Sequence, residues 1–200
     1  MGFDLYGIHP KNPNNLKRPF IDWTKEHTEE ETKEHFKKLD AFELAVPGNY
    51  FRANVWGWRP IWQFICDFCS DILSEKDMMA GEFNDGKKIC KTKAKRVAAR
   101  IRRLRRDGTL GTYSDIKNEI YEIAQKHNKR IQKKLDAFQK EVQRELNDDT
   151  IVPAHYPKKY KDEWNKLYQQ KDWNGYYPFR TQCVIDFGEF CDESGGFEIC

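Results

Sequence analysis

Residues 87–106 read KKICKTKAKRVAARIRRLRR and contain eleven lysines and arginines but no acidic residue. The whole chain of 200 residues has 35 basic and 32 acidic residues, a net charge of only +3. Removing these eleven from the 35 leaves 24 basic against 32 acidic residues, so the remainder has a net charge of −8. A positive charge this concentrated attracts phosphates or an acidic partner.

The same segment predicts a helix. Its apolar residues recur at steps of three and four and would form one buried face, made by Ala94, Val97, Ala98, Ile101 and Leu104. Gly108 follows as a stop signal. We expect Arg96, Arg100, Arg103 and Arg106 to share much of the exposed surface, because three- and four-residue steps keep them on one side.

Further helices are predicted on both sides of this segment. Residues 114–146 contain no proline or glycine and repeat apolar residues at helical spacing, so they would form a helix of about 50 Å. A helix over 158–170 would pack back on it as a helical hairpin. A capping box of Thr28 and Glu31 begins another helix. Two more are expected over 59–73, with Pro60 in the first turn, and over 182–193.

These elements predict a mainly α fold with minor β, the strands lying near residues 3–8 and 197–199. We expect a compact helical core formed by residues 1–111 and 172–200, with residues 112–171 as a long helical-hairpin arm. An aromatic content of 14% supplies a sizeable core. We expect no membrane span, because no run of about 18 apolar residues occurs. No secretory signal is recognised, so a cytosolic chain with reduced cysteines is expected.

The densest aromatic block, residues 50–62, allows two interpretations. Aromatic faces stack nucleic-acid bases and arginine binds phosphates, so Arg52, Asn54, Trp56, Trp58 and Arg59 are candidate binding residues. The alternative is a tryptophan core in which Arg52 and Arg59 are buried ion-pair partners. We expect this block and the basic helix to be the segments that line a ligand site.

The basic helix also allows two interpretations. Phosphate contacts are expected from Lys93, Arg96, Arg100, Arg103 and Arg106 if the helix binds nucleic acid. Alternatively, its charge is a solvated face that pairs with the acidic residues of 28–43 and of the long helix. Such surface pairs contribute little stability, so they need not be strong.

Cys66 and Cys69 have the spacing of a zinc knuckle. No second close pair exists, because Cys183, Cys191 and Cys200 are eight and nine residues apart. Cys66 and Cys69 also lie on or beside an apolar helix face, which favours buried structural thiols. Cys191 could be a nucleophile only with a base in reach, and no histidine stands in a recognisable catalytic motif. No metal or cofactor is therefore expected.

Four sequence stretches together resemble a known family: MGFDLYG (1–7), GNYFRANVWGWRP (48–60), FNDG (83–86) and FGEFCDESGGFEIC (187–200). They look like a family of small uncharacterised proteins of tailed bacteriophages, including phages of cyanobacteria. The resemblance covers both ends and residues 48–104. The family often has three consecutive tryptophans where this chain has Trp56-Gly57-Trp58. The resemblance implies an infected bacterial cytoplasm as the setting, and no mechanism.

From these observations we expect a non-enzymatic, phage-encoded binding protein that acts on a host or phage component. The alternative is a nucleic-acid-binding protein that uses residues 91–106, and a metal- or thiol-dependent enzyme is the weakest hypothesis. The expected partners are a host or phage protein, DNA or RNA, and a second copy of the chain bound through the helical arm. No membrane partner is expected.

Overall fold

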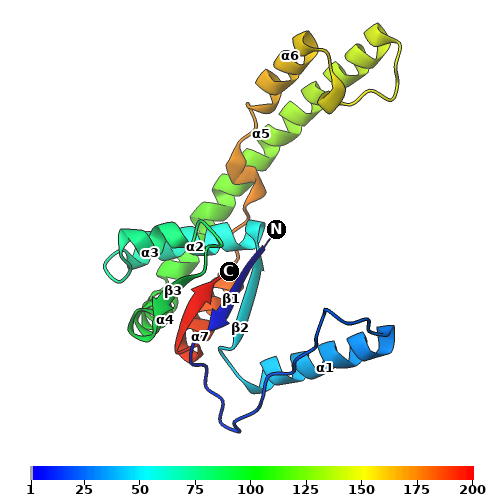
Figure 1. The fold of residues 1–200 in the computed structure, drawn as a ribbon. Helices are drawn as coiled ribbons and strands as arrows, with labels where there is room; N and C mark the ends of the chain where they lie inside the picture. The colour runs from blue at the N-terminus through cyan, green and yellow to red at the C-terminus, as the bar shows by residue number, and fades with distance from the viewer. Residues whose placement is uncertain (1) are drawn as a thin grey trace. The chain divides into compact units, whose positions relative to one another are not determined.

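The computed structural model describes Gly2–Cys200 and shows a mainly helical chain with one small sheet (Figure 1). Helix accounts for 62% of the chain and strand for 10%, which confirms the predicted mainly α fold with minor β. The elements follow in the order β1 (Gly2–Gly7), α1 (Glu29–Ala45), β2 (Tyr50–Asn54), α2 (Val55–Cys69), α3 (Glu75–Ala80), β3 (Lys87–Cys90), α4 (Lys91–Arg106), α5 (Thr109–Leu146), η1 (Pro153–His155), α6 (Lys158–Tyr168), η2 (Trp173–Tyr176), α7 (Thr181–Glu193) and β4 (Gly196–Ile199).

The chain divides into two compact units. Unit 1 joins Met1–Thr112 to Arg180–Cys200, and unit 2 is Tyr113–Phe179. The ring centroids of Tyr113 and Phe179 are 5.0 Å apart, so unit 2 begins and ends at neighbouring positions. Unit 2 is therefore an insertion between two parts of unit 1 in the sequence.

Unit 1 is built on a four-stranded antiparallel sheet with the strand order β2-β1-β4-β3. The register places Leu5 opposite both Phe51 and Ile199, and Ile89 opposite Phe197. These apolar residues alternate with polar ones, as expected for a sheet with one buried face. The first and last strands of the chain are thus neighbours at the centre of the sheet (Figure 1).

Helices α2, α4 and α7 pack on one another and on the sheet. An aromatic cluster fills this core, in which the Trp58 ring stacks on Phe3 at 5.2 Å and on Trp62 at 5.1 Å. The Trp58 indole donates a hydrogen bond to the Gly81 carbonyl oxygen at 2.7 Å, which satisfies its buried N–H. A Cβ at Gly81 would lie 1.8 Å from the Trp62 ring, so this position requires glycine.

Helix α1 begins as predicted at the Thr28 and Glu31 capping box. Phe42 is its one buried residue, which fits the weak apolar stripe of this segment. Its acidic side chains form local ion pairs, such as Lys33 with Glu29 at 2.6 Å. None of the ion pairs among the described residues joins an acid of α1 to the basic helix, so the expected pairing with residues 28–43 is not present.

Unit 2 is a hairpin of α5 and α6. Its core uses the second half of the apolar stripe of α5, where Ile131, Leu135 and Val142 are buried. The Phe138 ring packs at 6.5 Å from that of Trp164 on α6. The first half differs from the expected packing, because three isoleucines there are exposed, Ile116, Ile120 and Ile123.

Three of the predicted helices have different boundaries in the structure. Helix α2 spans Val55–Cys69 instead of 59–73, because the Asn54 side chain caps it by accepting a hydrogen bond from the Gly57 N–H at 2.8 Å. Pro60 therefore lies inside the helix and not in its first turn. Helix α5 starts at Thr109 instead of 114, because Gly108, at φ +85°, turns the chain within one residue. Helix α6 ends at Tyr168, two residues before the predicted end.

The basic segment is also not helical throughout. Lys87–Cys90 forms β3 and pairs with β4, so only Lys91–Arg106 forms the helix α4. Strand β2 was not predicted either. Both strands are short and gain their stability from pairing with residues distant in the sequence, which local patterns do not show.

Candidate functional site

The inward face of α4 consists of the five predicted apolar residues, which are all buried: Ala94, Val97, Ala98, Ile101 and Leu104. This prediction is confirmed. Helix α4 packs closely on α7, where a Cβ at Gly188 would lie 3.2 Å from the Ile101 side chain. The basic residues are therefore distributed over the two flanks of α4 and its outer face.

One flank of α4 is neutralised by acids near α2 and α3. Lys93 forms an ion pair with Asp77, whose carboxylate also accepts hydrogen bonds from the Ser74 hydroxyl at 2.6 Å and amide at 2.9 Å. Burial favours a higher pKa for Asp77, but the hydrogen bonds from Lys93 and Ser74 outweigh it and lower the pKa. Lys93 is thus committed to a contact inside the fold.

Arg100 lies on the same flank and is held in place at two points. Its guanidinium forms an ion pair with Asp71 at 2.7 Å and donates a second hydrogen bond to the Phe68 carbonyl oxygen. The hydrogen bond from Arg100 lowers the pKa of Asp71. The Arg100 side chain is only 20% exposed. The helical spacing predicted that it would be exposed, so this prediction was wrong.

The other flank of α4 faces Asp192 at the end of α7. Lys95 lies 3.0 Å and Arg102 3.1 Å from this one carboxylate. Burial favours a higher pKa for Asp192, but the two cations outweigh it and lower the pKa. Both flanks of α4 therefore hold charges that the fold already pairs.

The outer face of α4 keeps its positive charge. Arg96, Arg103 and Arg106 are exposed, and none has a carboxylate of the described residues within ion-pair distance. Arg96 donates only a long hydrogen bond, 3.5 Å, to the backbone oxygen of Asp71. At 1.5 Å rise per residue, the Cα atoms of Arg96 and Arg106 are about 15 Å apart along the helix. We call these three residues the arginine face.

A shallow hollow of about 230 Å³ adjoins the arginine face. Arg96, Arg100 and Arg103 line it, with Ile72 and Ala99 as its apolar residues. The short side chain of Ala99 leaves space between the arginines, and the two fixed contacts of Arg100 orient one wall. Arg96 and Arg103 have no carboxylate partner among the described residues, so the hollow between them is suited to a phosphate or carboxylate group.

The residues predicted from the aromatic block do not meet at one surface. Arg52 forms an ion pair with Asp4 at 3.5 Å across the sheet, and Arg59 pairs with Glu82 at 2.7 Å. Asn54 caps α2, and Trp58 is fully buried. Trp56 is 45% exposed. Structural contacts account for most of this block, as the tryptophan-core interpretation expected. The two ion pairs are not buried as it expected, because the side chains of Arg52 and Arg59 are 69% and 44% exposed.

Of the cysteines considered as metal ligands or nucleophiles, Cys69 and Cys191 are buried and Cys66 is half-buried. Burial raises the pKa of Cys66 to about 11 and that of Cys69 to about 12, so both are protonated near neutral pH. Cys191 is fully buried, and burial raises its pKa well above the usual value. Within Gly2–Cys200, no three histidine, cysteine, aspartate or glutamate side chains are grouped so that they could hold a metal ion.

The sequence reasoning missed the residues that decide which cations remain free. Asp71, Asp77 and Asp192 pair the flanks of α4, and Ile72 joins the hollow. Each comes from a segment distant in the sequence, so no local spacing marks it. Only the absence of acids within α4 itself hinted that partners would come from elsewhere.

Among the described residues, no helix is long and apolar enough to cross a bilayer. No protein-family model, no curated protein and no solved structure matches this chain.

Proposed function

We propose that this chain is a non-enzymatic binding protein that contacts nucleic-acid phosphates through the arginine face of α4. The observation that carries the proposal is the division of charge on this helix. Its flanking cations are paired by Asp71, Asp77 and Asp192, whereas the arginine face has no such partner. Unpaired arginines pointing to solvent attract anions at low cost, because no internal ion pair has to break.

The hollow beside the arginine face favours a phosphate over a general anion. Arginine presents a planar fork of donors that matches phosphate oxygens, and Arg100 is oriented in advance by Asp71 and Phe68. The three exposed arginines lie on one side of the helix, so they can contact phosphates of the same nucleic acid. Such contacts position a nucleic acid without reading its sequence.

A second candidate is an acidic protein partner. The apolar residues of the hollow, Ile72 and Ala99, favour it, because a partner's aliphatic carbons could cover them while its carboxylate meets the arginines. The resemblance to tailed-phage proteins supports a host or phage component as the target and an infected bacterial cytoplasm as the setting. We also propose that two copies of the chain associate through the exposed isoleucines of α5, which size-exclusion chromatography with light scattering would detect.

Binding to fluorescein-labelled duplex DNA and single-stranded RNA, followed by anisotropy between about 50 and 200 mM salt, tests the nucleic-acid proposal. Three phosphate contacts on a duplex predict a slope of about −2.7 for log K against log salt. Replacing Arg96, Arg103 and Arg106 with glutamine should weaken binding and flatten the slope. The helix should persist, because glutamine is a good helix former.

The matched control replaces three exposed cations of α5 with glutamine, Lys126, Arg130 and Lys133, and changes the net charge equally. The control should keep the affinity and salt slope of the original chain. Equal loss in both variants would show that overall charge, and not the arginine face, causes binding. No binding to either nucleic acid at low salt refutes the proposal and leaves the acidic protein as the candidate.

A further inference from the structure

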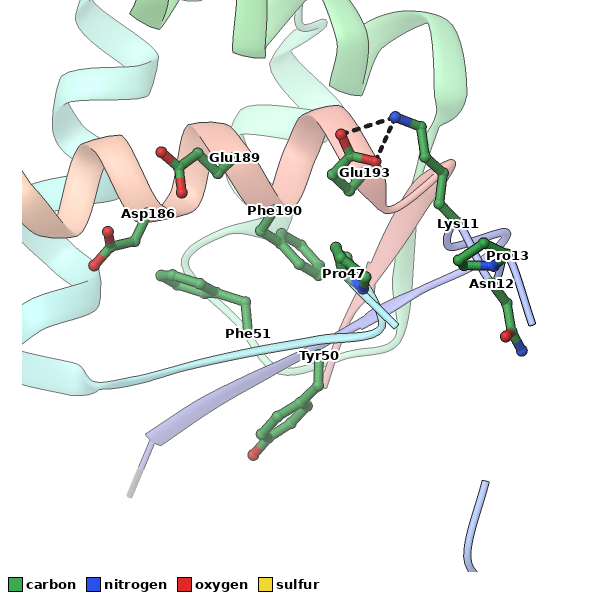
Figure 2. Close-up of a pocket in the computed structure, with 11 residues that line it drawn as sticks. Lys11, Asn12, Pro13, Pro47, Tyr50, Phe51, Asp186, Glu189, Phe190 and Glu193 are labelled. Atoms are coloured by element: carbon green, nitrogen blue, oxygen red, sulfur yellow. Dashed lines mark hydrogen bonds and ion pairs between the residues drawn. The ribbon is translucent and has the colours of Figure 1, made fainter. Parts of the chain in front are cut away.

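A hollow of about 830 Å³ lies where α7 meets β2 and the segment after β1. Figure 2 shows the rings of Phe51 and Phe190 on the side of β2 that faces α7, whereas Tyr50 points away from that helix. The two phenylalanine ring centroids are 5.6 Å apart. Phe51 is only half-buried, so part of an aromatic surface remains open to a ligand.

The helix beside these rings is acidic. Asp186, Glu189 and Glu193 follow at steps of three and four, so they line one side of α7 (Figure 2). Lys11 forms an ion pair with Glu193 at 2.7 Å, and Asp186 accepts a hydrogen bond from the Gln182 amide at 2.7 Å. Glu189 is exposed and has no hydrogen-bond or ion-pair partner among the described residues. The hollow thus has an excess of negative charge beside the partly open ring of Phe51.

The walls of this hollow are held together by close backbone contacts. A Cβ at Gly48 would lie 2.3 Å from the backbone carbon of Glu193, so the turn before β2 rests directly on the end of α7. The Lys11 amide donates a hydrogen bond to the Glu193 carbonyl oxygen at 3.2 Å, which fixes the third segment. A site that is already ordered loses little conformational entropy when a ligand binds.

We infer that this hollow binds an arginine side chain presented by an extended basic segment of a partner protein. A guanidinium group stacks on aromatic faces and forms paired hydrogen bonds with carboxylates, which are the two features that Phe51 and Glu189 offer. The volume exceeds what one side chain fills, so it also accommodates a neighbouring residue of the segment. Phosphates and acidic peptides are excluded by charge. The site is separate from the arginine face and does not depend on the proposed function.

The probe is the peptide Ac-Gly-Arg-Leu-Arg-Gly-amide, titrated into the full chain labelled with nitrogen-15 at low salt. We expect amide shift changes at Phe51, Glu189 and Phe190. The same peptide with citrulline in place of arginine keeps the shape but has no charge, and it should not bind. Argininamide alone should bind at least about tenfold more weakly, because it lacks the neighbouring residue.

The variant carrying Asp186→Asn and Glu189→Gln removes two exposed carboxylates without changing their shape. We expect it to bind the peptide roughly tenfold more weakly, since each exposed ion pair contributes little by itself. The matched control is Glu119→Gln with Glu122→Gln on α5, which changes the net charge equally and should bind as the original chain does.

Three results would overturn this inference. They are the absence of shift changes at the hollow, equal binding of the citrulline peptide, and equal weakening by the control variant. If argininamide bound as tightly as the peptide, the hollow would recognise a small cationic ligand. That result would overturn the inference that a segment of a partner protein binds there. The comparison of the two peptides uses the unaltered chain, so it decides the matter even if the double variant does not fold.

Discussion

Replacing Asp77 with asparagine tests whether Lys93 is held by the fold or kept for a ligand. Asparagine retains a side-chain oxygen that can accept from Ser74, so the capping box of α3 persists. The change removes the negative charge beside Lys93. The free energy of unfolding should fall, whereas nucleic-acid binding by the arginine face should not.

The size of this loss follows from the exposure of the pair. Exposed ion pairs contribute about 0.2–1 kcal/mol, and breaking a fully buried pair costs about 3–5 kcal/mol. The Asp77 side chain is 7% exposed and that of Lys93 is 32% exposed, so the pair lies between these limits. We expect a loss of about 2 kcal/mol. For a unit of about 130 residues this lowers Tm by roughly 7 °C.

The loss should also depend on pH. The pKa of Asp77 in the folded chain lies below the 3.8 of a free carboxyl group, because its hydrogen bonds outweigh the effect of burial. A lowered pKa stabilises the fold above the unfolded value, and this contribution disappears as pH falls through the folded value. The stability difference between the original chain and the variant should therefore be full at pH 6 and shrink below about pH 4.

Urea unfolding at pH 6 and pH 3.5, followed by circular dichroism, measures this difference. A cycle with Lys93→Gln isolates the pair, and the double variant should lose clearly less stability than the sum of the single variants. Equal stability of Asp77→Asn and the original chain at pH 6 would refute the structural role of Lys93. So would additive losses in the cycle.

Three other predictions concern packing, thiols and the two units. Gly81→Ala should lower the free energy of unfolding by about 2–3 kcal/mol, because the new methyl group overlaps an indole of α2. Gly108→Ala meets open space and should lower it by only about 1 kcal/mol, because of the positive φ at this position. Urea midpoints that rank the two variants the other way contradict this prediction. Cys69 should resist a thiol reagent in the folded chain at pH 8 while the exposed Cys90 reacts, and equal rates by mass spectrometry would contradict the buried position. Replacing residues 113–179 with a short glycine–serine linker should leave unit 1 with cooperative thermal unfolding, and a broad transition would show that the units fold as one.

The parts of the fold that could be predicted from the sequence are those set by neighbours in the chain. The inward face of α4 follows from helical periodicity, and the start of α1 follows from the Thr28 and Glu31 capping box. Strands β2 and β3 could not be found in this way, because each is stabilised by a partner strand far away in the sequence.

The candidate site shows the same division. The concentration of positive charge was visible at once, but which charges remain free depends on Asp71, Asp77 and Asp192, contributed by other elements. Helical spacing alone placed Arg100 with the exposed arginines. In the structure its side chain is mostly buried and forms an ion pair with Asp71. The hollow beside α7 is formed by three segments that are far apart in the sequence, so no local motif predicts it.

The central place of β4 has a consequence for synthesis on the ribosome. Residues 113–179 are contiguous, so unit 2 can form while the chain is still being made. Unit 1 cannot be completed until Gly196–Ile199 has emerged, because β4 is the strand that joins β1 to β3. At about 5–20 residues per second, the face of α4 that packs on α7 and β4 has no such partners for several seconds after α4 is made. A chain that is terminated before Gly196 therefore has no strand to join β3 to β1 and β2.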